Sequence, residues 1–284
     1  MRLVWTTDLH LDHAPPKMQE RWLSLIANQN WDGLLISGDI AEKGMSRTWL
    51  QRLVHEMKRP IYFVLGNHDF YGESIPFARQ ETIRLCREQQ NLHYLTDCSP
   101  IRLMEIGDET SPPTYLVGDD GWGDATTGDF ERSFVKLADF DKISDFVSLK
   151  PHQQKAQLQE LGLHSAQRLT TKLQKISEDD ARIIVLTHVP PFVESCWYEG
   201  KTADEDWSPF FVCGQTGDAL RSYASKHPNR QIIVLCGHCH HAGVTKPLNN
   251  LVVYTAEASI GNPSVAGKLD INHDSILLNS IRSR

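Results

Sequence analysis

The sequence contains little cysteine, no excess of positive charge and no long hydrophobic run. Six cysteines in 284 residues are too few for the disulfide framework of a small secreted protein. Met1 leads into a stretch with Asp8 and His10, without the basic and then apolar segments of a secretory signal. The longest apolar runs have strand length, well below the roughly 18 residues of a membrane span. These absences predict a cytoplasmic protein that does not enter a membrane.

The charge balance of the chain is acidic. Lys and Arg total 29 against 36 Asp and Glu, which gives a formal net charge of −7. A broad surface for nucleic acid needs clustered basic residues that displace counterions, so this balance argues against a nucleic acid polymer as partner. Histidine, in contrast, is abundant, with 13 residues. The positions of these histidines carry most of the functional information.

Short apolar runs bounded by turn residues predict the strands. They cover Leu3–Thr6, Gly33–Ser37, Ile61–Leu65, Tyr115–Val117, Ile183–Thr187, Ile232–Cys236, Leu251–Thr255 and Ser275–Leu278. Apolar residues at helical spacing separate the first three strands, over Met18–Ile26 and Trp49–Met57. The N-terminal half is therefore predicted to be β-α-β-α-β with a parallel sheet. A longer helix is expected over Gln153–Ile176, and the last two strands are expected in a second sheet.

No linker, repeat or low-complexity tract divides the sequence, which favours a single domain over residues 1–284. Pro, Gly and acidic residues are frequent in 118–128 and 190–217, and both segments follow a predicted strand. We therefore expect loop insertions at about 118–150 and 190–217. Such loops lie at the carboxyl ends of strands, where open α/β sheets bind their ligands.

Polar side chains that can bind metal follow five of the predicted strands. They are Asp8, His10, Asp39, Asn67, His188, His238 and His240. Residues two apart in an extended segment point the same way, so Asp8 pairs with His10 and His238 with His240. Each residue alone is compatible with a helix cap or a turn. Together, two carboxylates, four imidazoles and one amide exceed what one tetrahedral ion uses, whereas two ions sharing a carboxylate would use them all.

The order of these motifs resembles that of the calcineurin-like metallophosphoesterases. The motifs are DLH from Asp8, GD from Gly38, GNHD from Gly66, His188, and GHCH from Gly237, and they extend over most of the chain. The resemblance implies an α/β fold in which a two-sheet β-sandwich is flanked by helices in four layers, α/β/β/α.

The same resemblance implies a centre of two metal ions and a role for each motif residue. It gives one metal to Asp8, His10 and His240, and the second to Asn67, His188 and His238, with Asp39 bridging. It also implies that a hydroxide bridging the two metals hydrolyses a phosphate ester, and that His68 protonates the leaving group. Divalent or trivalent Mn, Fe, Zn or Co would suit these ligands, and the sequence does not choose among them.

Two motifs differ from those of the Ser/Thr protein phosphatases of this superfamily, and these differences limit the substrates that we expect. That branch carries GDxVDRG and GNHE, whereas this chain has GDIAEKG and GNHD. Glu42 and Lys43 thus occupy the places of an Asp that orients the catalytic histidine and of an Arg that binds substrate. Because lysine cannot form a bidentate guanidinium clamp, a protein phosphatase is disfavoured. The pattern is more similar to the branches rich in phosphodiesterases, which favours a small phosphodiester or phosphomonoester as substrate.

Several loop residues are candidates for substrate binding. Trp122 is expected to face Trp197 or Trp207 across the site, and a nucleotide-like group would stack between such rings. For the aromatic residues of 197–211, a small loop core is an equally good interpretation. His241 could reach either solvent or substrate. Acidic residues on the same two loops are expected to repel extended phosphate chains; they are Asp119, Asp120, Asp124, Asp204, Glu205 and Asp206.

Three other functions are also considered for this sequence. A nuclease of the same superfamily would fit GNHD, although such enzymes carry further domains and basic surface. A catalytically silent metal-binding scaffold would fit the ligands but leave His68 without a role. Cys236 to Cys239 spell the CGHC of disulfide isomerases, but that motif needs its first cysteine at a helix N-terminus, and Cys236 is expected to end a strand. The sequence does not indicate the oligomeric state. The remaining histidines, such as His13, are expected to be ordinary surface or core residues.

Overall fold

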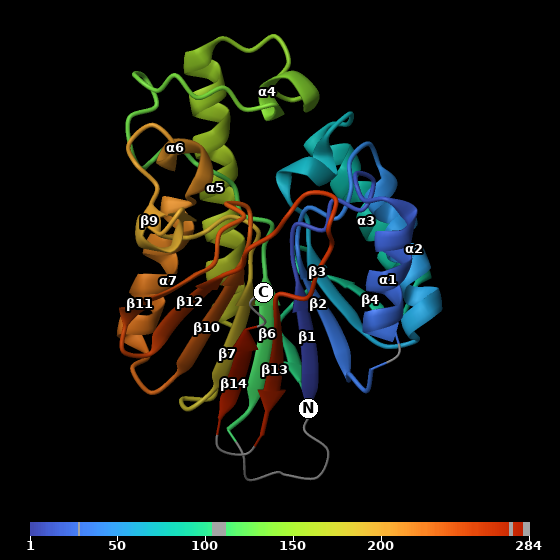
Figure 1. Ribbon diagram of the computed structural model, residues 1–284. Coiled ribbons are helices and arrows are strands. Elements are labelled where there is room, and N and C mark those ends of the chain that lie inside the picture. The colour runs from blue at the N-terminus through green and yellow to red at the C-terminus, as the bar shows by residue number, and fades with distance from the viewer. Residues whose placement is uncertain (28, 104–111, 273–274, 281–284) are drawn as a thin grey trace.

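A computed structural model describes residues 1–27, 29–103, 112–272 and 275–280. Two six-stranded sheets form the centre of the molecule, and helices cover the outer face of each sheet (Figure 1). The predicted four-layer α/β/β/α sandwich is therefore confirmed. None of the helices in the described part of the chain has the length and apolar character that a membrane span requires.

The first sheet has the strand order β14-β13-β1-β2-β3-β4. Its parallel strands are β1 (Arg2–Thr6), β2 (Gly33–Ser37), β3 (Ile61–Val64) and β4 (Leu92–Tyr94), and β13 (Gly267–Ile271) and β14 (Ile276–Ser280) are antiparallel. The connecting helices are α1 (Pro16–Ala27), α2 (Met45–Met57) and α3 (Ile75–Glu88). Because each connection returns the chain to a parallel strand, the segments after β1, β2 and β3 all begin at the same edge of the sheet.

The second sheet has the strand order β11-β12-β10-β7-β6-β5. Its strands are β5 (Ile101–Leu103), β6 (Thr114–Gly118), β7 (Arg182–Leu186), β10 (Gln231–Cys236), β11 (Gly243–Leu248) and β12 (Leu251–Thr255). The four central strands are parallel, and β5 and β11 are antiparallel edges. Helices α5 (Pro151–Leu173) and α7 (Gly214–Lys226) precede β7 and β10.

Short elements occupy the connections around the edge of the two sheets. They are η1 (Asn67–Phe70), α4 (Asp139–Lys142), η2 (Val193–Ser195), β8 (Trp197–Tyr198), β9 (Lys201–Thr202) and α6 (Ser208–Phe211). The segment 190–217, expected as a loop, thus contains four short elements and the first turn of α7.

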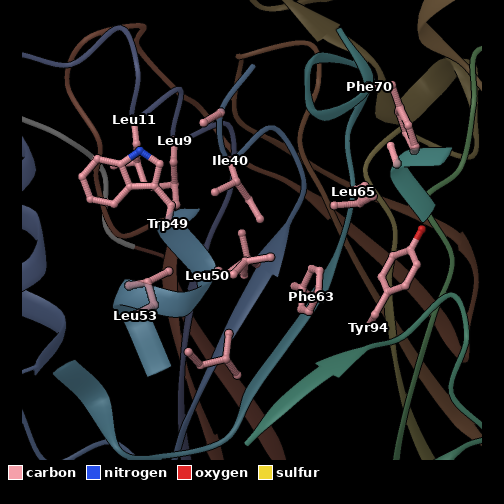
Figure 2. Packing of buried hydrophobic residues seen from close by; sticks show 14 of the residues in the cluster. Leu9, Leu11, Ile40, Trp49, Leu50, Leu53, Phe63, Leu65, Phe70 and Tyr94 are labelled. Atoms are coloured by element: carbon pink, nitrogen blue, oxygen red, sulfur yellow. The ribbon is translucent and has the colours of Figure 1, made fainter. Parts of the chain in front are cut away.

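Three apolar layers hold the sandwich together. Leu35 and Val64 of the first sheet belong to one buried cluster with Leu186 and Leu235 of the second, so the sheets pack face to face. The outer face of the first sheet packs on α1 to α3, and Figure 2 shows the side chains of α2 next to those around Phe63. A third cluster joins α5 and α7 to the outer face of the second sheet. The two sheets are therefore fixed relative to each other, which fixes the edge where their loops meet.

The predicted strands are all present, with ends shifted by up to two residues, and the predicted helices correspond to α1, α2 and α5. The expectation that the last two strands share the second sheet is wrong for β14, which pairs with β13 at the edge of the first sheet, whereas β12 does lie in the second. The sequence did not predict α3, α7 or the strands β4, β5, β11 and β13. Strands β11 and β13 alternate in burial, so they lack the continuous apolar run that marks the central strands. Helix α7 contains Gly214 and Gly217, which lower its helix propensity.

A buried carboxylate after β6 ties the elements around this edge together. Asp120 is fully buried, and its side chain accepts hydrogen bonds from the amide of Leu65 at 2.9 Å and from the hydroxyl groups of Tyr94 at 2.6 Å and Thr96 at 2.8 Å. The guanidinium of Arg79, on α3, lies 2.9 Å from the same carboxylate. One side chain of the second sheet thus anchors the ends of β3 and β4 and helix α3.

We expect Asp120→Ala to lower the free energy of unfolding by about 3–5 kcal/mol, because it leaves the largely buried Arg79 without its partner. Urea unfolding followed by circular dichroism measures the change. Glu20→Ala is the matched control, since Glu20 also pairs with an arginine, Arg52, at 2.6 Å, but at the surface. Its loss should be at most about 1 kcal/mol. Equal losses in the two variants would contradict the anchoring role of Asp120.

Candidate metal centre

The polar side chains predicted to follow the strands converge at one edge of the two sheets. They lie just after five strands: β1 (Asp8 and His10), β2 (Asp39), β3 (Asn67), β7 (His188) and β10 (His238 and His240). All of them are buried except His240, whose side chain is 27% exposed. The structure therefore brings together residues that are up to 232 positions apart in a region largely shielded from water.

Two groups of donors can be distinguished in this region. Donor atoms of Asp8, His10, Asp39 and His240 all lie within 4.8 Å of one another, and so do those of Asp39, His188 and His238. In the first group, Nε2 of His240 lies 3.2 Å from Oδ1 of Asp8 and 3.3 Å from Nε2 of His10. Asp39 is the one residue that belongs to both groups.

Asn67 completes the second group. Its side-chain Oδ1 lies 3.2 Å from Nε2 of His188, and the same nitrogen lies 3.2 Å from Nδ1 of His238 and 3.4 Å from Oδ2 of Asp39. An oxygen, two imidazole nitrogens and a carboxylate thus point at one place. Such a mixed nitrogen and oxygen set suits Mn, Fe, Zn or Co.

In His188 and His238, the ring nitrogen that points away from the donor group determines which nitrogen can bind a metal ion. Nδ1 of His188 lies 2.9 Å from the carbonyl oxygen of Ser37, and Nε2 of His238 lies 3.3 Å from the carbonyl oxygen of Phe210. Because a carbonyl only accepts, these nitrogens carry the hydrogens. The lone pairs of the two rings then lie on the nitrogens that face the donor group, as metal ligands require.

The buried carboxylates of Asp8 and Asp39 create a strongly negative environment. Burial raises the pKa of Asp8, but His240 and His188 outweigh it and bring the pKa to about 2. Burial lowers the pKa of His188, but the negative charge of Asp39 outweighs it and raises the pKa to about 10. The field that would hold a proton on His188 also attracts a metal cation, so the residues present fit the dinuclear centre that the sequence implies.

The backbone of these loops adopts a conformation that side chains seldom permit. Five of the seven candidate donors have a positive φ: 47° at Asp8, 39° at His10, 52° at Asp39, 69° at His238 and 57° at His240. Left-handed backbone at a residue with a side chain costs of order 1–3 kcal/mol and persists where surrounding structure enforces it. Its concentration at the donors indicates that the loops are built for a site.

Glycines beside the donors allow this close approach. A Cβ atom at Gly66 would lie 2.2 Å from Oδ1 of Asp39, and one at Gly237 would lie 2.0 Å from Oδ2 of Asp8. The neighbouring Asp69 accepts hydrogen bonds from the amides of Ile40, Ala41 and Gly66, and thereby ties the third motif to the second. The glycines and the last residue of GNHD thus have structural roles.

His68 lies next to the donors and is held from behind by Glu42. The rings of His68 and His10 have centroids 4.6 Å apart, and the His68 side chain is 25% exposed. Nδ1 of His68 lies 3.0 Å from Oε1 of Glu42. Burial raises the pKa of Glu42, but its contacts with His13, His68 and Lys142 outweigh it and lower the pKa. Glu42 is therefore placed to orient His68 with Nε2 away from it.

Three residues around His68 escaped the sequence reasoning. Nζ of Lys142, on α4, lies 3.3 Å from Oε2 of Glu42 and 4.6 Å from the centre of the Tyr71 ring. The Tyr71 ring packs against His68 in a tilted arrangement, with centroids 4.4 Å apart. His13, expected to be an ordinary histidine, lies with Nε2 3.3 Å from Glu42. Lys142 is 100 positions from Glu42, so no local motif could have indicated it.

The aromatic residues expected at the site lie in three different environments. Trp122 is 3% exposed and packs against Phe70 and Phe146 in the core, so the expectation that it faces the substrate is wrong. Trp197 is half-buried and packs directly against Gly243. Trp207 is 46% exposed. Of these three tryptophans, Trp207, just before α6, is the most exposed.

Trp207 is linked to the candidate donors through one intervening ring. It packs edge to face on Phe211, with centroids 5.5 Å apart, and the Phe211 ring lies 4.5 Å from that of His238. His241 packs against Tyr198, and its Nδ1 accepts a hydrogen bond from the Glu199 amide at 3.4 Å. Lys43, after Glu42, is exposed.

The acidic residues of segment 118–128 do not form the repelling surface that was expected. Asp119, Asp120 and Asp124 are buried. Asp119 pairs with Arg168 at 2.7 Å, and Asp120 pairs with Arg79. Their charges are compensated inside the molecule, because buried carboxylates need partners.

The structure also bears on the disulfide isomerase alternative. Cys236 is the last residue of β10, and it is fully buried. Burial raises the pKa of its thiol far above the ordinary value. A reactive cysteine needs the opposite shift, so this interpretation of CGHC is not supported.

Several solved structures share this fold. Phosphopantetheinyl Hydrolase from Mycobacterium tuberculosis has a TM-score of 0.67 at 15% identity, covering 91% of this chain and 89% of that chain. A dimetal phosphatase from Danio rerio has a TM-score of 0.57 at 12% identity, covering 99% of this chain and 95% of that chain. TT1561 of Thermus thermophilus has a TM-score of 0.53 at 14% identity, covering 99% of both chains. At these identities the similarity shows the fold.

Sequence comparison gives the family. No curated protein sequence matches the chain. The family model described as Calcineurin-like phosphoesterase matches residues 1–242, a range that contains every candidate donor and His68. The family uses a dinuclear metal centre, and this chain carries candidate metal-binding groups of Asp and His. The chain therefore belongs to the calcineurin-like phosphoesterase family.

Proposed function

We propose that the protein hydrolyses a small phosphate ester at a centre of two metal ions. The observation that carries this proposal is the position of Asp39, whose carboxylate belongs to both donor groups. Asp8, His10 and His240 would hold one ion, and Asn67, His188 and His238 the other, with Asp39 between them. When bound, the two ions would supply positive charge for the phosphoryl oxygens and activate water for attack on phosphorus.

His68 would act as the general acid of this reaction. It lies beside His10 without belonging to either donor group, and its partly exposed ring can reach a bound ester. A carboxylate that accepts from Nδ1 keeps the hydrogen on that nitrogen and fixes the orientation of the ring, so Glu42 would leave Nε2 of His68 facing the leaving oxygen.

Asp39→Asn should lower metal content at both positions, because the substitution removes the negative charge shared by the two donor groups. Elemental analysis of the purified protein measures the metal per chain. Asp218→Asn, at an exposed position of α7, is the control and should keep wild-type content. Wild-type metal content in Asp39→Asn would remove the bridging assignment.

His68→Ala should keep the metals and lower kcat by about 10²–10⁴-fold, the usual contribution of a positioned general acid. The loss should be smaller for a nitrophenyl ester than for an alkyl ester, because nitrophenolate leaves without a proton. Steady-state kinetics with the two esters measures the difference. Equal losses for both esters would indicate a phosphate-binding role instead.

Glu42→Gln tests the orientation of His68. The variant keeps the shape of the side chain but replaces the carboxylate that accepts from Nδ1 of His68 with an amide. We expect the leaving-group pattern of His68→Ala in a milder form. If Glu42→Gln lowers turnover of both esters equally, the orienting role of Glu42 is wrong while that of His68 stands.

The substrate is proposed to be a small monoester or diester with a flat, nucleotide-like group. The chain is acidic overall, and the segment before α6 adds Asp204, Glu205 and Asp206, which disfavour a polynucleotide. Trp207 and Phe211 extend as an aromatic surface from His238. A base or similar ring can stack there beside the metal centre.

Trp207→Ala should raise KM for such a substrate by roughly tenfold, because stacking on an aromatic ring contributes about 1–3 kcal/mol. Turnover of nitrophenyl phosphate should hardly change. Phe77→Ala, at an exposed aromatic residue of α3, is the matched control. Unchanged kinetics in Trp207→Ala would assign that ring to a loop core.

The same assays decide between the proposal and its alternatives. A nuclease would cleave long DNA with a steep dependence on salt. A silent scaffold would bind metals without hydrolysing any ester. The cysteines Cys86, Cys98, Cys196, Cys213, Cys236 and Cys239 are all free thiols, which supports the proposed cytoplasmic location.

A further inference from the structure

The amide of Asn67 has two different ends in the structure. Its Oδ1 faces His188 Nε2 at 3.2 Å, on the side of the second donor group. Its Nδ2 points the other way and donates to Oδ1 of Asp139 at 2.8 Å and to the hydroxyl of Tyr71 at 3.3 Å. Only the oxygen of an amide can bind a metal ion, so the orientation of this group decides whether Asn67 serves as a ligand.

Asp139 determines which way the Asn67 amide points. It is buried, and its Oδ1 also accepts a hydrogen bond from the Tyr71 hydroxyl at 2.6 Å. The hydroxyl of Tyr71 can donate or accept, so by itself it would tolerate either amide orientation. An oxygen that already receives the hydrogen of Tyr71 can only accept. With Asp139 in place, Asn67 must present its NH₂ to Asp139 and its carbonyl oxygen to the donor group.

We propose that Asp139 is a positioning residue that fixes the Asn67 amide with its oxygen toward the second metal ion. The inference rests on the proposed function insofar as Asn67 is taken as a ligand of that ion. It assigns a role to a residue of the segment 118–150 that no sequence motif indicated. If the amide rotated by half a turn, its NH₂ hydrogens would meet the cation and the second ion would lose a ligand.

The backbone holds Asp139 in position independently of Asn67. The amide of Gly72 donates to the carbonyl of Lys142 at 2.7 Å, and the amide of Ser144 donates to the carbonyl of Glu73 at 3.0 Å. The amide of Ile75 donates to the side chain of Asp145 at 2.7 Å. Since these bonds join α4 to the chain just after η1, removal of the Asp139 side chain should leave the segment docked.

The test is metal binding by the full-length protein after its metals have been removed with a chelator. Titration with Co²⁺, followed by visible absorption and calorimetry, reports the affinity and the coordination of each ion. Wild type should bind two ions. In Asp139→Ala the second ion should bind about 10–100-fold more weakly, as is usual when a partner of a metal ligand is removed. The first ion should retain its wild-type affinity.

Two further variants separate orientation from charge and from folding. Asp139→Asn keeps an oxygen acceptor for the Asn67 amide but removes the negative charge, and it should bind the second ion nearly as well as wild type. Asp141→Ala, at an exposed acidic residue of the same short helix, should match wild type. Circular dichroism of every variant checks that the fold is retained.

Each outcome has a defined meaning. Two-ion binding in wild type with unchanged affinity in Asp139→Ala overturns the positioning role and leaves the metal centre intact. Equal losses in Asp139→Asn and Asp139→Ala also overturn it, because the effect is then one of charge. Wild-type protein that binds fewer than two ions removes the metal centre itself, and with it this inference.

Discussion

The carboxylate of Asp39 joins the two halves of the site. One oxygen accepts a hydrogen bond from the His68 amide at 2.9 Å, and the other lies 3.4 Å from Nε2 of His188 and 3.7 Å from Nε2 of His10. This single group therefore connects the loop after β2 with the loops after β1, β3 and β7. A buried carboxylate needs compensation by hydrogen bonds and positive charge, and these loops supply the groups that surround it.

The rest of the molecule provides the rigidity that such an arrangement requires. Left-handed backbone at five candidate donors is unfavourable locally, and the two packed sheets and the loops around them offset that cost. Asp120 and Lys172 contribute at the same edge. Nζ of Lys172 donates to the carbonyls of Leu95, Thr96 and Gly118 at 2.6 to 2.9 Å, which secures the chain after β4 and the end of β6. The stability of the sandwich and the geometry of the site are thus coupled.

The segment between β6 and α5 contains none of the motifs, but its side chains contact two residues of the site. Its short helix α4 supplies Lys142 to Glu42 and Asp139 to Asn67. One element therefore contacts both the residue behind His68 and a candidate metal ligand. Variation in this segment offers a physical route by which the same motif residues can be tuned, because it acts through partners and not through the donors themselves.

The sequence by itself determined the central strands, the motif residues at their ends and the family. Continuously apolar runs predict buried strands, and glycine followed by Asp, Asn or His marks the sharp loops after them, because these signals are local. Only the tertiary structure decided the surroundings. It buried Trp122, neutralised Asp119 and Asp120, and brought Lys142 to Glu42 across 100 positions. Such contacts depend on how the two sheets and the segment 118–150 pack, and no spacing along the chain encodes them.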